Sequence, residues 1–153
     1  MTAVVNQPWL STARGPEEGS GWFAAPAGFS VKVLAADAVA LTAEYLARLS
    51  CAQRTGPFRH LADTFVYIMD GELRELETGA LYTTGDCCCQ PAGVIHDLRA
   101  GADGVTIYVN QRADVGRLIE FCDATGVVFD VLAVSTLAAH VRAVTLAEAD
   151  ACP

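Results

Sequence analysis

Basic residues are scarce in this chain, and their scarcity limits the partners that it can bind. Of 153 residues, ten are Lys or Arg and eighteen are Asp or Glu, which gives a formal net charge of −8. Lys32 is the single lysine, and the arginines are scattered along the chain rather than clustered. A nucleic-acid-binding surface needs clustered cations to neutralise phosphates. We therefore expect no nucleic-acid partner.

Long apolar runs are also missing, although apolar residues make up 52% of the chain. No stretch approaches the roughly 20 apolar residues that a bilayer-spanning helix needs. The opening MTAVVNQPWLSTARGPEEGS has no basic start followed by an apolar run, so it does not resemble a secretory signal. We expect no membrane association, a cytoplasmic location and one domain with a closed core.

The six cysteines lack the pairs spaced by two residues that are typical of structural zinc sites. Three of them are consecutive, at residues 87–89, and the others are solitary. Neighbouring residues on a strand point to opposite faces, so this run cannot form a disulfide within itself. We expect reduced thiols, as in a reducing cytosol, and we interpret residues 87–89 as small strand hydrophobes.

Short segments with strand character follow one another from about residue 30. Gly, Pro or Asp separates most of them, and this spacing is typical of a sandwich or barrel. The predicted strands cover residues 30–36, 39–49, 63–70, 72–78, 86–90, 94–100, 104–111, 117–123 and 126–132.

The two ends of the chain differ from this pattern. Residues 1–28 are rich in Gly, Pro, Ser and Ala and are interpreted as an irregular arm, with Trp9 and Trp22 packed on the barrel. Apolar residues at helical spacing over residues 134–149 predict a C-terminal helix, with Ser135 or Thr136 as its N-cap. Residues 29–153 are thus predicted to form one all-β barrel with a C-terminal helix.

Two segments carry the motifs of a known superfamily. Gly85, Pro91, Gly93 and His96 have the spacing of the second cupin motif, in which glycines and proline form turns and the histidine then points into the barrel. Upstream, the segment Gly56-Pro-Phe58-Arg-His60, followed by Thr64 and Gly71, resembles the first cupin motif, which normally reads His-X-His, then Glu, then Gly. The chain therefore resembles the cupin superfamily, which implies an RmlC-like jelly-roll barrel.

A narrower resemblance extends over residues 8–145. Pro8-Trp9-Leu10, residues 31–37 and residues 126–131 with the following helix are similar to small cupins related to 2,4'-dihydroxyacetophenone dioxygenase and acetylacetone dioxygenase. This resemblance implies a non-haem metal, commonly Fe(II), that is held mainly by histidines. It also implies cleavage of a carbon–carbon bond beside a carbonyl with dioxygen. The chain departs from the motif because Phe58 stands at the first histidine position and Thr64 at the glutamate position.

Alternation along the strand after Gly71 supplies carboxylates that could complete a site. Cupins usually place apolar, inward residues two, four and six positions after this glycine, since alternate strand residues share a face. The resemblance therefore implies that Leu73, Glu75 and Glu77 face the cavity. Glu77 also falls close to a glutamate that the dihydroxyacetophenone dioxygenase group is thought to use as a ligand. The resemblance thus implies one divalent metal per chain, Fe(II) by preference, held facially by the ligands His60, Glu77 and His96.

Roles for the remaining residues follow from this arrangement. Glu75 and His96 are the candidate catalytic residues for moving a proton. The predicted substrate pocket contains Phe58, Thr64 and Leu73, and the predicted substrate is a small carbonyl-bearing molecule.

Three alternatives remain open at this point. A one-residue register slip would turn Glu75 and Glu77 outward. A metal-free cavity could perform isomerisation, dehydration or cyclisation with Glu75, Glu77 and His96, or the chain could bind a small molecule without catalysis. A homodimer is expected through edge strands and the N-terminal arm.

Overall fold

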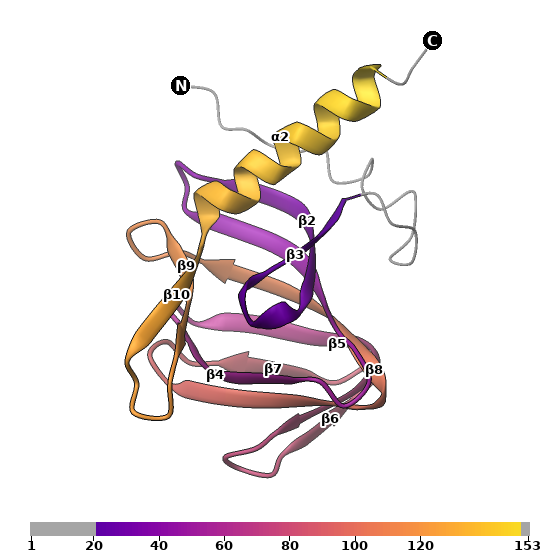
Figure 1. Ribbon diagram of the computed structural model, residues 1–153, viewed down its shortest axis with the longest axis vertical. Helices are drawn as coiled ribbons and strands as arrows, with labels where there is room; N and C mark the ends of the chain where they lie inside the picture. Colours follow the sequence, from indigo (N-terminus) through magenta and orange to yellow (C-terminus); the bar gives the residue numbers. More distant parts are fainter. Residues whose placement is uncertain (1–20, 151–153) are drawn as a thin grey trace.

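The strands of this chain curl around one interior, with a helix at one end (Figure 1). The fold is that of a computed structural model, in which residues 21–150 are described, with their side chains as far as residue 142. The elements in chain order are β1 (Trp22–Ala24), a 3-10 turn η1 (Pro26–Gly28), β2 (Ser30–Asp37), β3 (Thr42–Leu49), β4 (Arg54–His60), β5 (Thr64–Glu75), β6 (Leu81–Thr83), β7 (Cys87–Gln90), β8 (Ile95–Arg112), β9 (Arg117–Cys122), β10 (Val128–Ala133) and α2 (Val134–Asp150).

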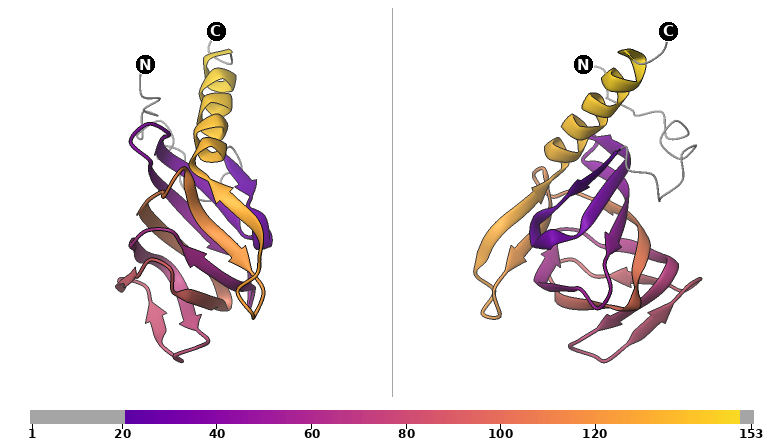
Figure 2. Two further views of the ribbon diagram at one scale, coloured as in Figure 1. Left: turned by 90° about the vertical axis from the view of Figure 1, so that its left-hand side faces the viewer. Right: turned by 45° about the vertical axis from the view of Figure 1, so that its right-hand side comes forward.

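Two long strands, β5 and β8, each contribute to both halves of the curled sheet. Residues 105–112 of β8 lie between β3 and the first part of β5, which also pairs with β7. Residues 95–100 of β8 lie between β4 and the end of β5. Strands β1 and β2 extend the first half beyond β3, and β9 and β10 extend the second half beyond β4. The two further views in Figure 2 show the sheet folding back over its own interior.

The core fills this interior because apolar and polar side chains alternate along the strands. In β5, buried and exposed positions alternate from Thr64 to Met69, and in β8 the odd positions from Val105 to Val109 are buried. Alternation of this kind places one face of each strand in the core. The predicted all-β fold with one C-terminal helix is confirmed.

Several predicted boundaries differ from the structure. Predicted strands 63–70 and 72–78 are one strand, β5, and predicted strands 94–100 and 104–111 are one strand, β8. Gly71 and Gly104 bend these strands without reversing the chain. The Cβ that Gly71 lacks would lie 2.2 Å from the Gly104 carbonyl oxygen, so the two backbones can meet there only at glycine.

The sequence patterns missed β4 and β6, and β1 lies inside the segment predicted as an irregular arm. Trp22 on β1 is half-buried, and the Arg48 guanidinium stacks on its ring at 4.3 Å. Trp9 lies outside the described residues. Strand β1 pairs in antiparallel register with β2, which extends the sheet where no strand had been predicted.

Helix α2 packs its first turns on β2 through Leu137, Ala138 and Val141, all of which are buried. It begins at Val134, so the predicted caps Ser135 and Thr136 lie within its first turn. Over the described residues, no helix has the length and apolar character required to span a bilayer.

Candidate functional site

The two cupin-motif histidines meet inside the barrel because their strands are paired neighbours. Phe58 and His60 are buried on β4, and the register of β4 with β8 sets Phe58 opposite His96. The turn before β8 is tied to β4, since the Gly93 N–H donates a hydrogen bond to the His60 carbonyl at 2.9 Å. The glycine of the second motif thereby holds the histidine of the first motif in place.

His96 forms a buried dyad with Glu75, which lies at the end of β5. Nδ1 of His96 and Oε1 of Glu75 are 2.7 Å apart, and both side chains are buried. When Nδ1 donates its proton to the carboxylate, Nε2 keeps its lone pair. Among the described residues, Nε2 of His96 is buried and has no hydrogen-bond partner. The dyad therefore presents one unpaired imidazole nitrogen inside the protein.

His60 is paired with a neutral side chain instead. Its Nε2 lies 2.6 Å from Oε1 of Gln90, and its Nδ1 is buried without a hydrogen-bond partner among the described residues. Burial lowers the pKa of His60 to about 4, with the nearby His96 adding to the effect, although the hydrogen bond to Gln90 opposes it. At neutral pH His60 is therefore an uncharged imidazole.

Gln90 was not predicted as a site residue, but the strand pattern contains a signal for it. In the run Cys87 to Gln90, alternation places Cys88 and Gln90 on the same face, and Cys88 pairs with buried Val66. Burial, with the neighbouring Glu75 charge, raises the pKa of Cys88 to about 11, so this inward cysteine stays a thiol at neutral pH.

Phe58 takes the place of a histidine and packs against both imidazoles. Its ring centroid lies 5.3 Å from that of His60 and 5.9 Å from that of His96, whose own rings are 6.3 Å apart. The phenyl ring of Phe58 thus occupies the position that a third imidazole would take.

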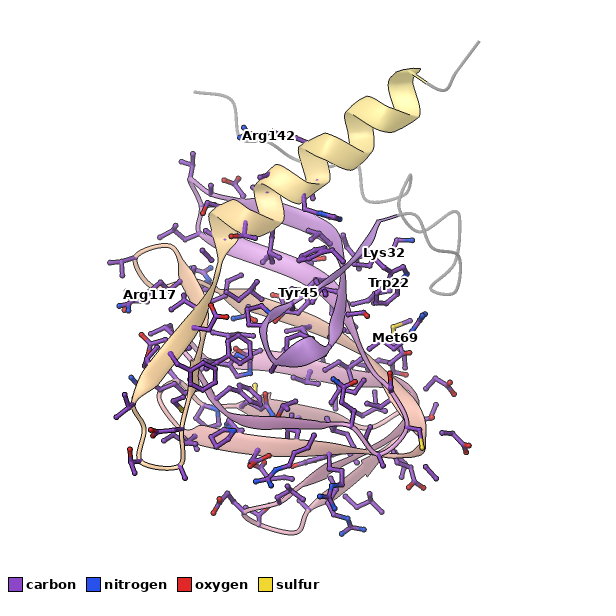
Figure 3. All side chains as sticks on the ribbon, viewed as in Figure 1. Trp22, Lys32, Tyr45, Met69, Arg117 and Arg142 are labelled. Carbon is purple, nitrogen blue, oxygen red and sulfur yellow. The ribbon has the colours of Figure 1, made fainter. Side chains whose placement is uncertain are left out.

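A small cavity of about 40 Å³ borders this cluster. Its walls are mainly apolar, and Figure 3 shows Tyr45, one of the lining residues, in the interior. Pockets for drug-sized ligands have volumes of about 300 Å³ or more. A ligand of this cavity is therefore very small, or it enters as side chains move. The lining includes Phe29, Tyr45, Phe58, His60, Gln90 and Phe121, but not His96 or Glu75.

The two other predicted pocket residues are buried without lining the cavity. Thr64 donates a hydrogen bond from Oγ1 to the Ala62 carbonyl at 3.0 Å. Leu73 is part of the apolar core. Phe58 is the predicted pocket residue that borders the cavity.

Glu77 does not join the histidines, and the prediction that it faces the cavity is wrong. Glu75 is the last residue of β5, and residues 76–78 form a turn in which Glu77 is exposed. The turn is closed by a hydrogen bond from the Gly79 N–H to the Glu75 carbonyl at 2.9 Å. Alternation ceases to predict the facing of side chains once the strand has ended.

The donors present do not fit a three-ligand metal site in this arrangement. Within residues 21–142, no three His, Cys, Asp or Glu side chains come together with the spacing of metal ligands. Glu75 and Gln90 each engage one imidazole, so neither is free to act as a third ligand. Two unpaired imidazole nitrogens remain.

Comparison with known proteins agrees with the cupin motifs. A family model described as the ChrR cupin-like domain matches residues 16–114. No curated protein sequence matches the chain.

Solved structures share the fold at low sequence identity. An acetylacetone dioxygenase from Acinetobacter johnsonii is 12% identical with a TM-score of 0.68, over 85% of this chain and 91% of that one. An RmlC-like cupin from Ralstonia eutropha JMP134 is 17% identical with a TM-score of 0.70, over 88% and 87% of the two chains. A chain in the complex of Rhodobacter sphaeroides SigE with the anti-sigma ChrR is 13% identical with a TM-score of 0.57, over 66% and 54%.

Proposed function

The chain belongs to the ChrR cupin-like domain family, and on this premise we propose that it is a cupin enzyme that transfers protons on a small carbonyl-bearing molecule. The single observation that carries this proposal is the buried Glu75–His96 dyad with its unpaired Nε2. A carboxylate that orients an imidazole is a recurrent arrangement in general acid–base catalysis.

In the proposed reaction, Nε2 of His96 is the base. It removes a proton from the carbon beside a carbonyl, which leaves an enolate, and returns a proton to another carbon or to oxygen to give an isomer. Glu75 accepts the Nδ1 hydrogen bond throughout, which keeps the ring oriented and stabilises the imidazolium that forms. Nε2 is buried, and His96 does not line the cavity, so Phe58, which lines the cavity and packs against His96, must move aside for a substrate to reach Nε2.

The substrate class rests on the cavity and on the fold neighbours. A small apolar cavity favours a short, uncharged molecule over a sugar, nucleotide or large anion. A solved relative in fold is named as an acetylacetone dioxygenase, an activity on a small diketone. These observations support a short ketone or hydroxyketone as the ligand.

Hydrogen–deuterium exchange tests this proposal, with two neighbouring glutamates as a matched pair. In D₂O, the protein should accelerate exchange of the carbon-bound protons beside the carbonyl of small ketones and hydroxyketones, as followed by NMR. Glu75→Gln and His96→Asn should each lower the rate by about 10²-fold or more, the usual contribution of a positioned acid or base. Glu77→Gln should leave the rate unchanged, because Glu77 is exposed in the turn.

Equal losses in Glu75→Gln and Glu77→Gln would contradict the proposed dyad. Ligand-induced chemical shifts at His60 or His96 without any exchange would instead support a non-catalytic small-molecule-binding cupin.

A metal-dependent dioxygenase that cleaves a carbon–carbon bond beside the carbonyl is the second candidate. It is favoured by the two buried nitrogens, Nδ1 of His60 and Nε2 of His96, that lack partners among the described residues. Fe(II) bound there would supply a site for dioxygen, but Glu75 or Gln90 would first have to release its histidine to give a third ligand.

Metal analysis separates the two candidates. Under the proton-transfer proposal, protein reconstituted with Fe(II), Mn(II), Ni(II) or Zn(II) should retain well below one equivalent after dialysis. Phe58→His should raise the retained metal, because it adds an imidazole beside His60 and His96. Retention of one equivalent by the parent protein, lost in His96→Ala, would instead support the dioxygenase.

A further inference from the structure

The outer face of β7 carries two thiols that the interior site does not use. Cys87 and Cys89 are both exposed and stand two positions apart on the strand, so they share a face. In the register with β5, Cys87 lies opposite Tyr67 and Cys89 opposite Phe65, and these two aromatic side chains are also exposed. The thiols therefore stand side by side on an open surface.

A third sulfur atom lies on the same face. Met69 follows Tyr67 by two positions on β5, is 39% exposed, and appears at the outer surface in Figure 3. In the register of β5 with β7, Met69 lies on the side of Cys87 that is away from Cys89, so it does not converge with the two thiols. The strands remain paired beside Met69, because the Ile68 N–H donates to the Asp86 carbonyl at 2.9 Å.

The spacing of the two thiols favours a bridging ion over a disulfide. Two residues along a strand span about 6.6 Å, whereas the Cβ atoms of a disulfide lie about 3.5–4.5 Å apart. A metal–thiolate bond of about 2.3 Å gives an in-line sulfur–metal–sulfur span of about 4.6 Å, which the two side chains reach by leaning toward each other. Both thiols are exposed, so the outer face of β7 leaves room for an ion between them.

We propose that Cys87 and Cys89 form a surface binding site for monovalent copper. Thiolate and thioether ligands are soft donors and select Cu(I) over harder divalent ions. Binding forms two copper–thiolate bonds and releases the two thiol protons to solvent, with no change in the oxidation state of copper or sulfur. The site is independent of the proton-transfer chemistry proposed for the interior.

Anaerobic titration of the reduced protein with Cu(I), in competition with a chromophoric Cu(I) chelator, tests the site. One equivalent should be held per chain, with about two protons released at a pH where the thiols are otherwise protonated. Cys87→Ser and Cys89→Ser should each lower the affinity by at least about tenfold, and Met69→Leu should leave it unchanged. Cys51→Ser and Cys88→Ser are the matched controls and should leave it unchanged, because Cys51 is an exposed thiol in the turn between β3 and β4 and Cys88 faces inward.

Thiol protection gives a second measurement on the unmodified protein. One equivalent of Cu(I) should protect Cys87 and Cys89 from maleimide alkylation in the folded protein while Cys51 still reacts, as read by peptide mass spectrometry. Loss of all copper to the chelator, equal weakening by Cys51→Ser, or uniform protection of the three thiols would overturn the proposal.

Discussion

Phe58 and His60 share the inward face of β4, and together they set the polarity of the barrel interior. Phe58 replaces a nitrogen donor with an apolar ring that packs against both histidines. His60 has no carboxylate partner, and the neutral amide of Gln90 cannot offset the cost of burying a charged ring. Its lowered pKa of about 4 is the direct consequence.

This pKa predicts a dependence of stability on pH. The unfolded state, with a histidine pKa of about 6.5, binds more protons than the folded state between pH 6.5 and the folded pKa of about 4. The free energy of unfolding should therefore have its full value above about pH 6.5 and decrease as the pH is lowered from 6.5 toward 4.

Urea denaturation at pH 7 and pH 5 measures the effect. The parent protein should lose about 2 kcal/mol more than His60→Gln over this interval. A parallel loss in the two proteins would show that His60 keeps an ordinary pKa when folded. Titration of the His60 ring by NMR provides an independent value.

At the scale of elements, the bend shared by β5 and β8 decides how the sheet curls. Gly71 has a φ of +94° and Gly104 a φ of +79°, in the left-handed region that favours glycine. Glu75 follows the bend in β5, and His96 precedes the bend in β8. The bend therefore places the two side chains on neighbouring strands, where they form the dyad.

Gly71→Ala should be strongly destabilising, and Gly79→Ala is its matched control. Both glycines have positive φ, but the Cβ added at Gly71 meets the Gly104 carbonyl oxygen at 2.2 Å, whereas at Gly79 it meets open space. Gly79→Ala should cost about 1 kcal/mol from backbone strain, and Gly71→Ala at least about 2 kcal/mol more. Equal midpoints of urea denaturation for the two variants would contradict this account of the bend.

For the whole molecule, the sheet ends in edge strands whose backbone groups are open to pairing. Strand β10 is such an edge, and it carries Phe129, which is 69% exposed, next to Val127 and Val128. Its hairpin lies near exposed Ile95, since a Cβ at Gly126 would be 3.7 Å from Ile95 Cδ1. Exposed apolar groups along an open edge favour pairing with a second copy.

We propose a homodimer that uses this edge, and sedimentation velocity at micromolar concentration should give twice the monomer mass. Phe129→Asp should shift the protein toward monomer, because it places a charge in the contact. Val39→Asp, at an equally exposed apolar residue in the turn between β2 and β3, should leave the dimer intact. A monomer in the parent protein, or equal effects of the two variants, would count against this interface.

Local pattern by itself determined the all-β class and the C-terminal helix, and the resemblance to the cupin motifs gave the inward positions of Phe58, His60, Glu75 and His96. Alternation along a strand and the turns of the cupin motifs depend on residues close together in sequence, so one chain suffices to predict them.

Only the tertiary structure decided which side chains meet. His60 is paired with Gln90 thirty residues away, and His96 with Glu75 twenty-one residues away, on strands whose register depends on the bend at Gly71 and Gly104. Glu77 was predicted to face inward because its pattern continues beyond the strand, whereas the turn at residues 76–78 ends the alternation. The length of a strand and its pairing partners are set by the whole sheet, because the backbone hydrogen bonds that extend or end it come from distant segments.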